Sequence, residues 1–219
     1  MVEESVTVLS PVTADPDLRR TSLPPGAVAE TRVMDDGWPA RTLRWAGRGP
    51  AILFAGGRAD FIEKYSEAIW HWVVDEGRAV TAFDWRGQGL SGRLGVTPHH
   101  GHAGGFDRWV DDLDALAAWF TDDQPGPHAL VAHSMGGHLA MRHLARGGRR
   151  FAGAVLLAPM FGIRGTRPAV GRIARVMTAL GFGGRWSVGQ VPYGERQRSP
   201  LRSGLLTGSP ERFAAEHAW

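Results

Sequence analysis

The 219-residue chain has no cysteine, and this absence limits the chemistry available to it. A chain without thiols has no disulfides, no thiolate metal sites and no cysteine nucleophile. The same absence fits a reducing compartment. Any nucleophilic catalysis must therefore use another side chain.

Long apolar runs are missing as well. No stretch of about 18 apolar residues offers a membrane-spanning helix. The amino terminus, MVEESVTVLSPV, has acidic residues where a secretory signal peptide carries basic ones. We therefore expect a cytoplasmic protein whose contact with a membrane, if any, is peripheral.

Lysine is nearly absent, since Lys64 is the only one and arginine carries almost all of the basic charge. Residues 1–141 hold 19 acids and 12 bases, whereas residues 142–219 hold 13 arginines and three acids. Such a basic segment is suited to phosphate groups, a carboxylate product or an acidic partner, although a solvated surface is its commoner explanation. It contains no recognisable nucleic-acid-reading motif, so we expect no nucleic acid partner.

The residues that are present indicate one α/β domain. Apolar residues make up 43% of the chain, enough for a substantial core. Short apolar runs alternate with segments of helical periodicity, which predicts a mostly parallel sheet with helices on both faces. The expected strands are a hairpin over 28–46 and runs at 50–57, 78–84, 127–134 and 151–160; the expected helices are 61–77, 106–123 and 135–148.

Three segments follow from this pattern. Residues 1–28 form a lead-in whose proline-rich part, 9–27, we expect to be extended. Residues 29–163 form the core, and residues 164–219 form part of a lid with one helix near 168–180 and another that begins at the N-cap Ser209.

The segment LVAHSMGGHLAMRHLA predicts a strand, a tight turn at Ser134 and a helix. Ala132 and Gly136 flank Ser134 two positions away, and small residues are needed there because a nucleophile elbow, G-x-S-x-G, is sharp and strained. The N–H of Met135 lies at the start of the helix, where it can donate to a developing oxyanion. Ser134 is therefore the candidate nucleophile.

Several ordered motifs between residues 29 and 165 resemble the α/β-hydrolase superfamily, in particular its bacterial lysophospholipase and monoacylglycerol lipase-like serine hydrolases. They are ILFAGGRADFIEKYSEAIWHWVVDEGRAVTAFDWRGQGLSGR, GHAGGFDRWVDDLDAL, VAHSMGGHLAMRHLA and AVLLAPM. The resemblance implies an α/β-hydrolase fold with an inserted lid, cleavage of lipid-like carboxylic esters through an acyl-enzyme, and no cofactor. It assigns Ser134 as nucleophile and the backbone N–H groups of Met135 and Gly57 as oxyanion donors, although Ala55 replaces the histidine that usually precedes the second donor.

The resemblance also suggests supporting residues. Asp84 and Arg86, in DWRGQGLS, are expected to brace the loop beside the elbow, and Gly101-His102 is expected to be structural. His133 occupies the variable position of the elbow and is expected to point away from it. The cluster HHGH at 99–102 lacks matching carboxylates, so we expect no metal site there.

A serine nucleophile needs a histidine base oriented by a carboxylate, and in this superfamily the acid and then the histidine follow the serine along the chain. None of the downstream candidates follows a recognisable strand: Glu195, Glu211, Glu216, His138, His143 and His217. We therefore expect the acid and the base beyond Trp219, and a truncated sheet with an exposed apolar edge.

The expected function is hydrolysis of a lysophospholipid or monoacylglycerol through an acyl-enzyme on Ser134. The lid would line an acyl pocket with Phe161, Ile163, Val176, Met177, Leu180 and Phe182, and its arginines (among them Arg164, Arg167 and Arg172) would face phosphate or a membrane surface. The alternative is a catalytically inactive relative that binds an apolar ligand or partner.

Overall fold

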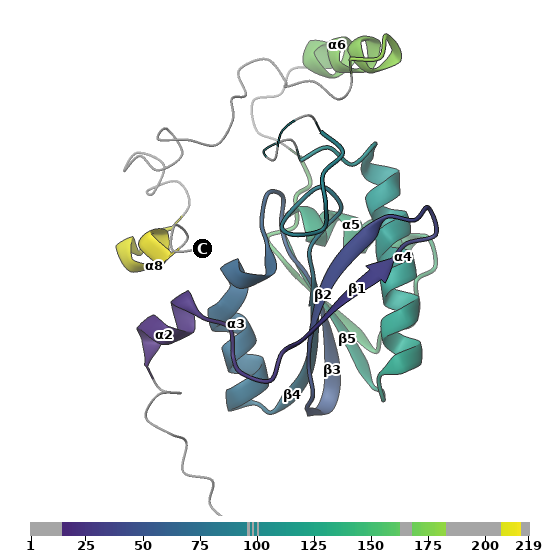
Figure 1. Cartoon of the computed structure of the whole chain (residues 1–219). Coiled ribbons are helices and arrows are strands. Elements are labelled where there is room, and N and C mark those ends of the chain that lie inside the picture. Colours follow the sequence, from purple (N-terminus) through teal and green to yellow (C-terminus); the bar gives the residue numbers. More distant parts are fainter. Residues whose placement is uncertain are drawn as a thin grey trace, which may run out of the picture.

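The computed structural model describes residues 15–95, 97, 99, 101–162, 168–182 and 207–215. Its centre is a six-stranded sheet in the order β1-β2-β4-β3-β5-β6 (Figure 1). β1 and β2 form an antiparallel hairpin, β2 runs antiparallel to β4, and the pairs β4–β3, β3–β5 and β5–β6 are parallel. The strands are β1 (Val28–Val33), β2 (Pro39–Trp45), β3 (Arg48–Ala55), β4 (Arg78–Phe83), β5 (His128–His133) and β6 (Gly153–Leu157).

Helices cover both faces of this sheet (Figure 1). α4 (Phe106–Asp123) and α5 (Met135–Ala145) pack on one face, where Trp109, Leu113 and Leu139 are buried. The other face holds a continuous helical segment made of η1 (Ile62–Tyr65), α3 (Ser66–Trp70) and η2 (His71–Asp75), with Ile62 and Ile69 buried. The two buried clusters confirm a sheet covered on both sides.

The expected strands and helices are present, and two details differ. The segment 61–77 is helical but passes from a 3₁₀ turn through an α-helix to a π-turn. The proline-rich lead-in is not extended throughout, because Pro16–Thr21 forms helix α2. Asp15 caps this helix through the N–H of Asp17, and Pro16 occupies its first turn, a start signal that the surrounding prolines obscured.

β6 forms one edge of the described sheet, where it pairs with β5. Val155 and Leu157 on this strand are 52% and 46% exposed, so the expected apolar edge is present. An exposed apolar edge strand favours association with other chains.

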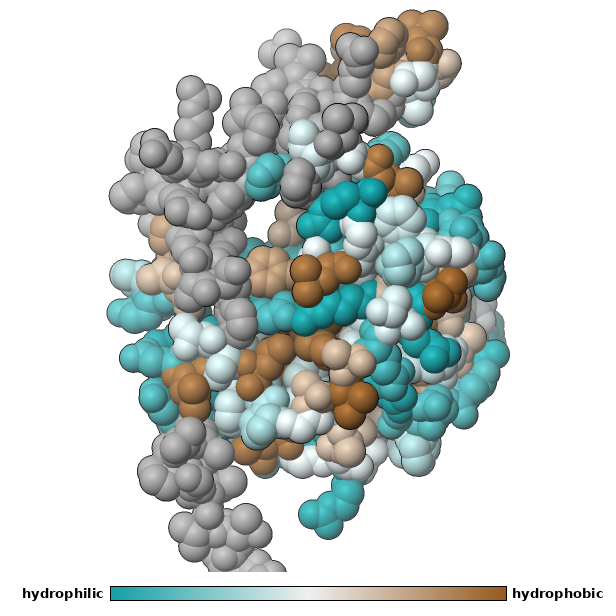
Figure 2. Space-filling view, in the orientation of Figure 1, coloured by the Kyte–Doolittle hydropathy of each residue, from teal (hydrophilic) through white to brown (hydrophobic). Residues whose placement is uncertain are grey.

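Beyond β6 the structure describes two helices of the segment predicted to form a lid, α6 (Pro168–Ala179) and α8 (Pro210–Ala215). α6 matches the helix expected near 168–180. Ser209 caps α8, since its hydroxyl accepts from the N–H of Arg212 at 3.3 Å. Figure 2 shows the apolar side chains of α6 at the top of the molecule, away from the sheet. None of the helices in the described ranges is both long enough and apolar enough to cross a bilayer.

Candidate active site

Ser134 lies at the turn between β5 and α5, at the carboxyl end of the parallel strands. Its backbone has φ 52° and ψ −115°, a conformation that is strained for any residue except glycine. The turn is held from the side of β6, because the Ser134 N–H donates to the Leu157 carbonyl at 2.9 Å and the Ser134 carbonyl accepts from the Met160 N–H at 2.9 Å. This strained, supported conformation has the geometry of a nucleophile elbow.

The small residues around Ser134 allow a close approach between α5 and the loop after β3. Ala132 is fully buried. A Cβ on Gly136 would overlap the carbonyl oxygens of Ala55 and Gly56, and a Cβ on Gly137 would lie 3.0 Å from the Cβ of Pro159. The start of α5 therefore packs directly against the backbone of the loop that carries Gly57.

Gly57 lies beside Ser134. A Cβ on Gly57 would be 3.3 Å from the Ser134 Cβ and 3.2 Å from the His133 Nδ1, and it would overlap the Asp60 carboxylate. A side chain at this position would have to displace the Asp60 carboxylate. The structure thus brings together three residues that the sequence predicts for the site: Ser134, Met135 and Gly57.

The Gly57 N–H already has two acceptors, Tyr65 Oη at 2.9 Å and Asp60 Oδ2 at 3.1 Å. The Tyr65 hydroxyl donates to the Asp60 carboxylate at 2.5 Å, and it lies 2.8 Å from the His133 Nδ1. Since the hydroxyl has one proton and gives it to Asp60, the His133 Nδ1 must be the donor in that contact. An oxyanion held by the Gly57 N–H would have to replace these acceptors.

The surroundings of Asp60 and Tyr65 set the charge states of these two groups. Burial raises the pKa of the Asp60 carboxyl, but the nearby His133, whose Nδ1 lies 3.8 Å away, the charge and hydrogen bond of Lys64, and the hydrogen bond from Tyr65 outweigh it and lower the pKa to about 2. Burial and the Asp60 charge raise the pKa of Tyr65 above its ordinary value. Asp60 is therefore an anion and Tyr65 a neutral phenol at neutral pH.

This arrangement corrects one expectation. His133 does not point away from the site, because its ring faces the loop with Gly57 and reaches Tyr65. The sequence offered little to predict this, since Asp60 and Tyr65 are single polar residues at the start of a segment whose dominant signal is helical periodicity.

A buried glutamine clamps the same loop. The Gln88 Oε1 accepts from the Ala59 N–H at 2.6 Å, and its Nε2 donates to the Gly57 carbonyl at 3.2 Å. The Trp85 Nε1 donates to the Gly56 carbonyl at 2.8 Å. The loop DWRGQGLS thus supports the loop after β3 through side chains that the sequence interpretation did not single out.

Asp84 and Arg86 brace this region, as expected. Asp84 accepts from the N–H groups of Ile62 and Leu90 at 3.0 and 2.9 Å, and burial raises the pKa of its carboxyl. Arg86 lies between the carboxylates of Asp112 and Asp36, and their hydrogen bonds, that of Asp112 above all, raise the pKa of its guanidinium.

The described downstream candidates do not form a triad with Ser134. His138 lies edge-on to Phe106, with ring centroids 5.8 Å apart, and His143 pairs with Asp114 of α4. Glu211 accepts from the Ser209 hydroxyl at the start of α8. In the part of the chain that the structure describes, no side chain forms a hydrogen bond with the Ser134 Oγ.

The lid residues expected to line an acyl pocket are exposed where the structure describes them. The exposed fractions of Phe161, Val176 and Leu180 are 77%, 59% and 67%, and Met177 and Phe182 are also exposed. Their exposure means that they do not line a closed pocket in the described structure. Outside the described residues lie Ile163, Arg164, Arg167, Glu195, Glu216, His217, Trp219 and His100 of the HHGH cluster.

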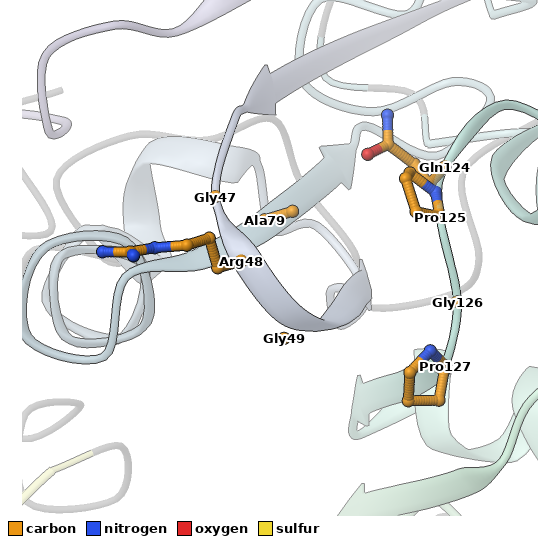
Figure 3. Close-up of a pocket in the computed structure, with 8 residues that line it drawn as sticks. All are labelled: Gly47, Arg48, Gly49, Ala79, Gln124, Pro125, Gly126 and Pro127. Atoms are coloured by element: carbon orange, nitrogen blue, oxygen red, sulfur yellow. The ribbon is translucent and has the colours of Figure 1, made fainter.

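A hollow of about 200 Å³ lies at the opposite end of the sheet (Figure 3). It is lined by residues from the starts of β3 and β4 and from the turn before β5, whereas Ser134 follows the end of β5. Figure 3 shows the Arg48 side chain directed away from Pro125 and Pro127. In parallel α/β sheets, ligands bind at the carboxyl ends of the strands, so this hollow is not the candidate active site.

Comparison with known proteins gives a consistent result. Residues 49–202 match the family described as serine aminopeptidase, S33. The chain is 38% identical to lysophospholipase L2 of Escherichia coli K12 over 140 residues, which cover 62% of this chain and 40% of that protein. It is 33% identical to the probable lysophospholipase L2 of Haemophilus influenzae, with 71% and 49% covered. The chain therefore spans less than half the length of these relatives.

A solved structure supports the architecture. The α/β-hydrolase GrgF from Penicillium superposes with a TM-score of 0.58 at 20% identity, over 90% of this chain and 74% of that one. At this level of identity the likeness concerns the fold alone.

Proposed function

The chain belongs to the serine aminopeptidase S33 family and has the α/β-hydrolase fold, and from this premise we propose that the protein is a serine hydrolase of carboxylic esters with lipid-like substrates. The observation that carries the proposal is the strained backbone of Ser134, supported at the carboxyl end of the sheet beside Gly57. The lysophospholipase names of its relatives favour a lysophospholipid substrate, with monoacylglycerol as the neutral counterpart.

In the proposed reaction, the Ser134 Oγ loses its proton to a histidine base and attacks the ester carbonyl carbon. The N–H groups of Met135 and Gly57 donate to the oxyanion that forms. Collapse of this intermediate breaks the bond to the glycerol oxygen, which takes the proton from the histidine. Water then attacks the acyl-enzyme and releases the fatty acid.

We place the catalytic acid and histidine after Trp219 in the chain order of the superfamily. Two observations support this placement. The described histidines that follow Ser134 have other partners, since His138 packs against Phe106 and His143 pairs with Asp114, and the chain spans less than half the length of its lysophospholipase relatives. Gly57 must also exchange Asp60 and Tyr65 for the oxyanion, so substrate binding is expected to move the Asp60 and Tyr65 side chains off the Gly57 N–H.

The lid helix α6 is proposed to lie on the surface of lipid aggregates. Its exposed apolar side chains Val170, Ile173 and Val176 repeat at helical spacing. Its charged residues are arginines, Arg172 and Arg175, which suit lipid phosphates. A peripheral contact of this kind would deliver the substrate to the carboxyl end of the sheet.

The test measures hydrolysis by the protein expressed from its complete reading frame. The two substrates are a lysophospholipid and a monoacylglycerol that carry the same acyl chain. We expect fatty acid release from at least one substrate, and a loss of about 10³-fold or more in Ser134→Ala. Ser209→Ala, which changes a serine at the start of α8, is the control and should keep full activity. Failure of the wild type to hydrolyse either ester, with binding of the intact lipid, would favour the non-catalytic alternative.

A further inference from the structure

We propose that Arg58 binds the phosphate of a lysophospholipid whose ester carbonyl lies at Ser134, and so selects phospholipid over neutral substrates. The inference rests on the proposed function, because it concerns the head group of the same substrate. It begins from the position of Arg58, which directly follows Gly57 in the loop after β3.

The loop presents Arg58 in a fixed conformation. The residues on both sides of Arg58, Gly57 and Ala59, form hydrogen bonds with the same buried side-chain amide, that of Gln88. Ala59 has φ 60°, a left-handed conformation that is strained for alanine. A strained backbone held by a buried side chain indicates that the orientation of this tip is tightly set.

The Arg58 guanidinium lies over an aromatic ring. Its central carbon is 5.7 Å from the centroid of the Trp109 ring, and its Nη2 is 3.9 Å from the position that a Cβ on Gly101 would take. Trp109 is itself fixed, because its Nε1 donates to the Arg86 carbonyl at 3.0 Å. Burial lowers the pKa of the guanidinium, although the residue as a whole is exposed and open to a ligand.

No carboxylate of the described residues pairs with this cation. Within the described residues, Arg58 forms neither a hydrogen bond nor an ion pair. The nearest acid along the chain, Asp60, is engaged by Lys64 and Tyr65 instead. Arg86, by contrast, lies between two carboxylates. A partly desolvated arginine without a counter-ion gains most from an anionic ligand.

A lysophospholipid supplies that anion at a suitable place. Its ester carbonyl and its phosphate are separated by a glycerol backbone, and Arg58 is one residue from the proposed oxyanion donor. Guanidinium groups match phosphate oxygens through paired N–H donors. A monoacylglycerol has the same glycerol backbone and no charge, so it isolates the contribution of the phosphate.

The first experiment measures the ratio of kcat/KM for a lysophosphatidyl ester to that for the monoacylglycerol of the same chain length, with the complete protein. Arg58→Gln should lower this ratio about tenfold to a hundredfold, which is the range for one charge-assisted hydrogen-bonded contact. The ratio for Arg58→Lys, which keeps the charge, should lie between those of wild type and Arg58→Gln. Arg32→Gln is the matched control, because Arg32 also stacks on a tryptophan, at 4.3 Å from Trp119, but on β1. An unchanged ratio in Arg58→Gln would overturn the proposal.

The second experiment separates this inference from the proposed function. An ether-linked lysophospholipid cannot be hydrolysed, so its Kd reports head-group recognition without turnover. Arg58→Gln should weaken binding about tenfold or more relative to wild type and Arg32→Gln, even if no ester is cleaved. Equal Kd values would overturn the role of Arg58 even if the enzyme is active. Release of the ether lipid from the wild type by millimolar inorganic phosphate would indicate a free-anion site and would also overturn lipid recognition.

Discussion

The loop after β3 and the helix α6 each follow a parallel strand along the chain, β3 and β6 respectively. They differ in how their residues are packed. In the loop, Gly57, Ala59 and Asp60 are held by hydrogen bonds to buried partners, and a Cβ on Gly57 would overlap the Asp60 carboxylate. In α6, residues 169–179 are all exposed. The difference means that the geometry proposed for catalysis is set within the core, whereas α6 has an apolar face without a partner among the described residues.

The largest expected effect on stability comes from the carboxylates that pair with the buried Arg86. Asp112→Ala should lower the free energy of unfolding by about 3 kcal/mol, because it leaves the buried Arg86 guanidinium with one carboxylate instead of two. Asp122→Ala on the same helix removes an exposed pair with Arg150 and should cost at most about 1 kcal/mol. Urea unfolding measures both, and equal losses would contradict the account.

Two glycines offer a direct comparison of the regions. Gly136→Ala should destabilise the fold by up to about 3 kcal/mol, because the new Cβ overlaps backbone carbonyl oxygens that cannot move aside. Gly171→Ala on α6 meets no atom within 4 Å and should raise helix stability by about 0.5–1 kcal/mol. Thermal unfolding of the two variants checks the prediction, and a destabilising Gly171→Ala would mean that α6 is packed in solution.

The Asp60 network predicts a pH dependence. The folded-state pKa of Asp60 is about 2, below the unfolded value of about 3.9, so the ionised carboxylate stabilises the fold above the unfolded pKa. This contribution, about 2 kcal/mol, should disappear as the pH falls toward 2. The stability difference between wild type and Asp60→Asn should therefore be largest at pH 5–7 and decline by pH 3. A pH-independent difference would exclude this electrostatic origin.

The smallest expected stability effect is on α6. Ile173→Ser should change the free energy of unfolding by no more than about 0.5 kcal/mol, because the side chain is 60% exposed. The same change should weaken sedimentation with phospholipid vesicles. Ile69→Ser is the buried counterpart on α3, 0% exposed, and should be strongly destabilising.

Much of the fold followed from sequence. Apolar runs located β3, β4 and β5, because strands buried on both faces must be apolar along their length. The hairpin of β1 and β2 was predicted from alternating residues around Asp36-Gly37, and β6 from a further short apolar run. The elbow could also be predicted from sequence, because the small residues Ala132 and Gly136 are those that a sharp turn at Ser134 requires. In both cases the signal is local in sequence.

The remaining features depend on contacts between distant segments. Tyr65 and His133 are 68 positions apart, and the Tyr65 hydroxyl contacts the His133 Nδ1. Gln88 accepts a hydrogen bond from Ala59, which lies 29 positions earlier. Neither contact produces a residue spacing that can be recognised in a single sequence. The helix α2 was missed for another reason: its Asp-Pro start lies within a proline-rich segment that also suits extended chain.

The most direct test of the central claim is the reaction of the complete protein with a fluorophosphonate, followed by mass spectrometry of its peptides. The account predicts one phosphonate on the peptide that contains Ser134 in wild type and none in Ser134→Ala. Modification of another serine, or none in a protein that hydrolyses lipid esters, would contradict the assignment of Ser134 as the nucleophile.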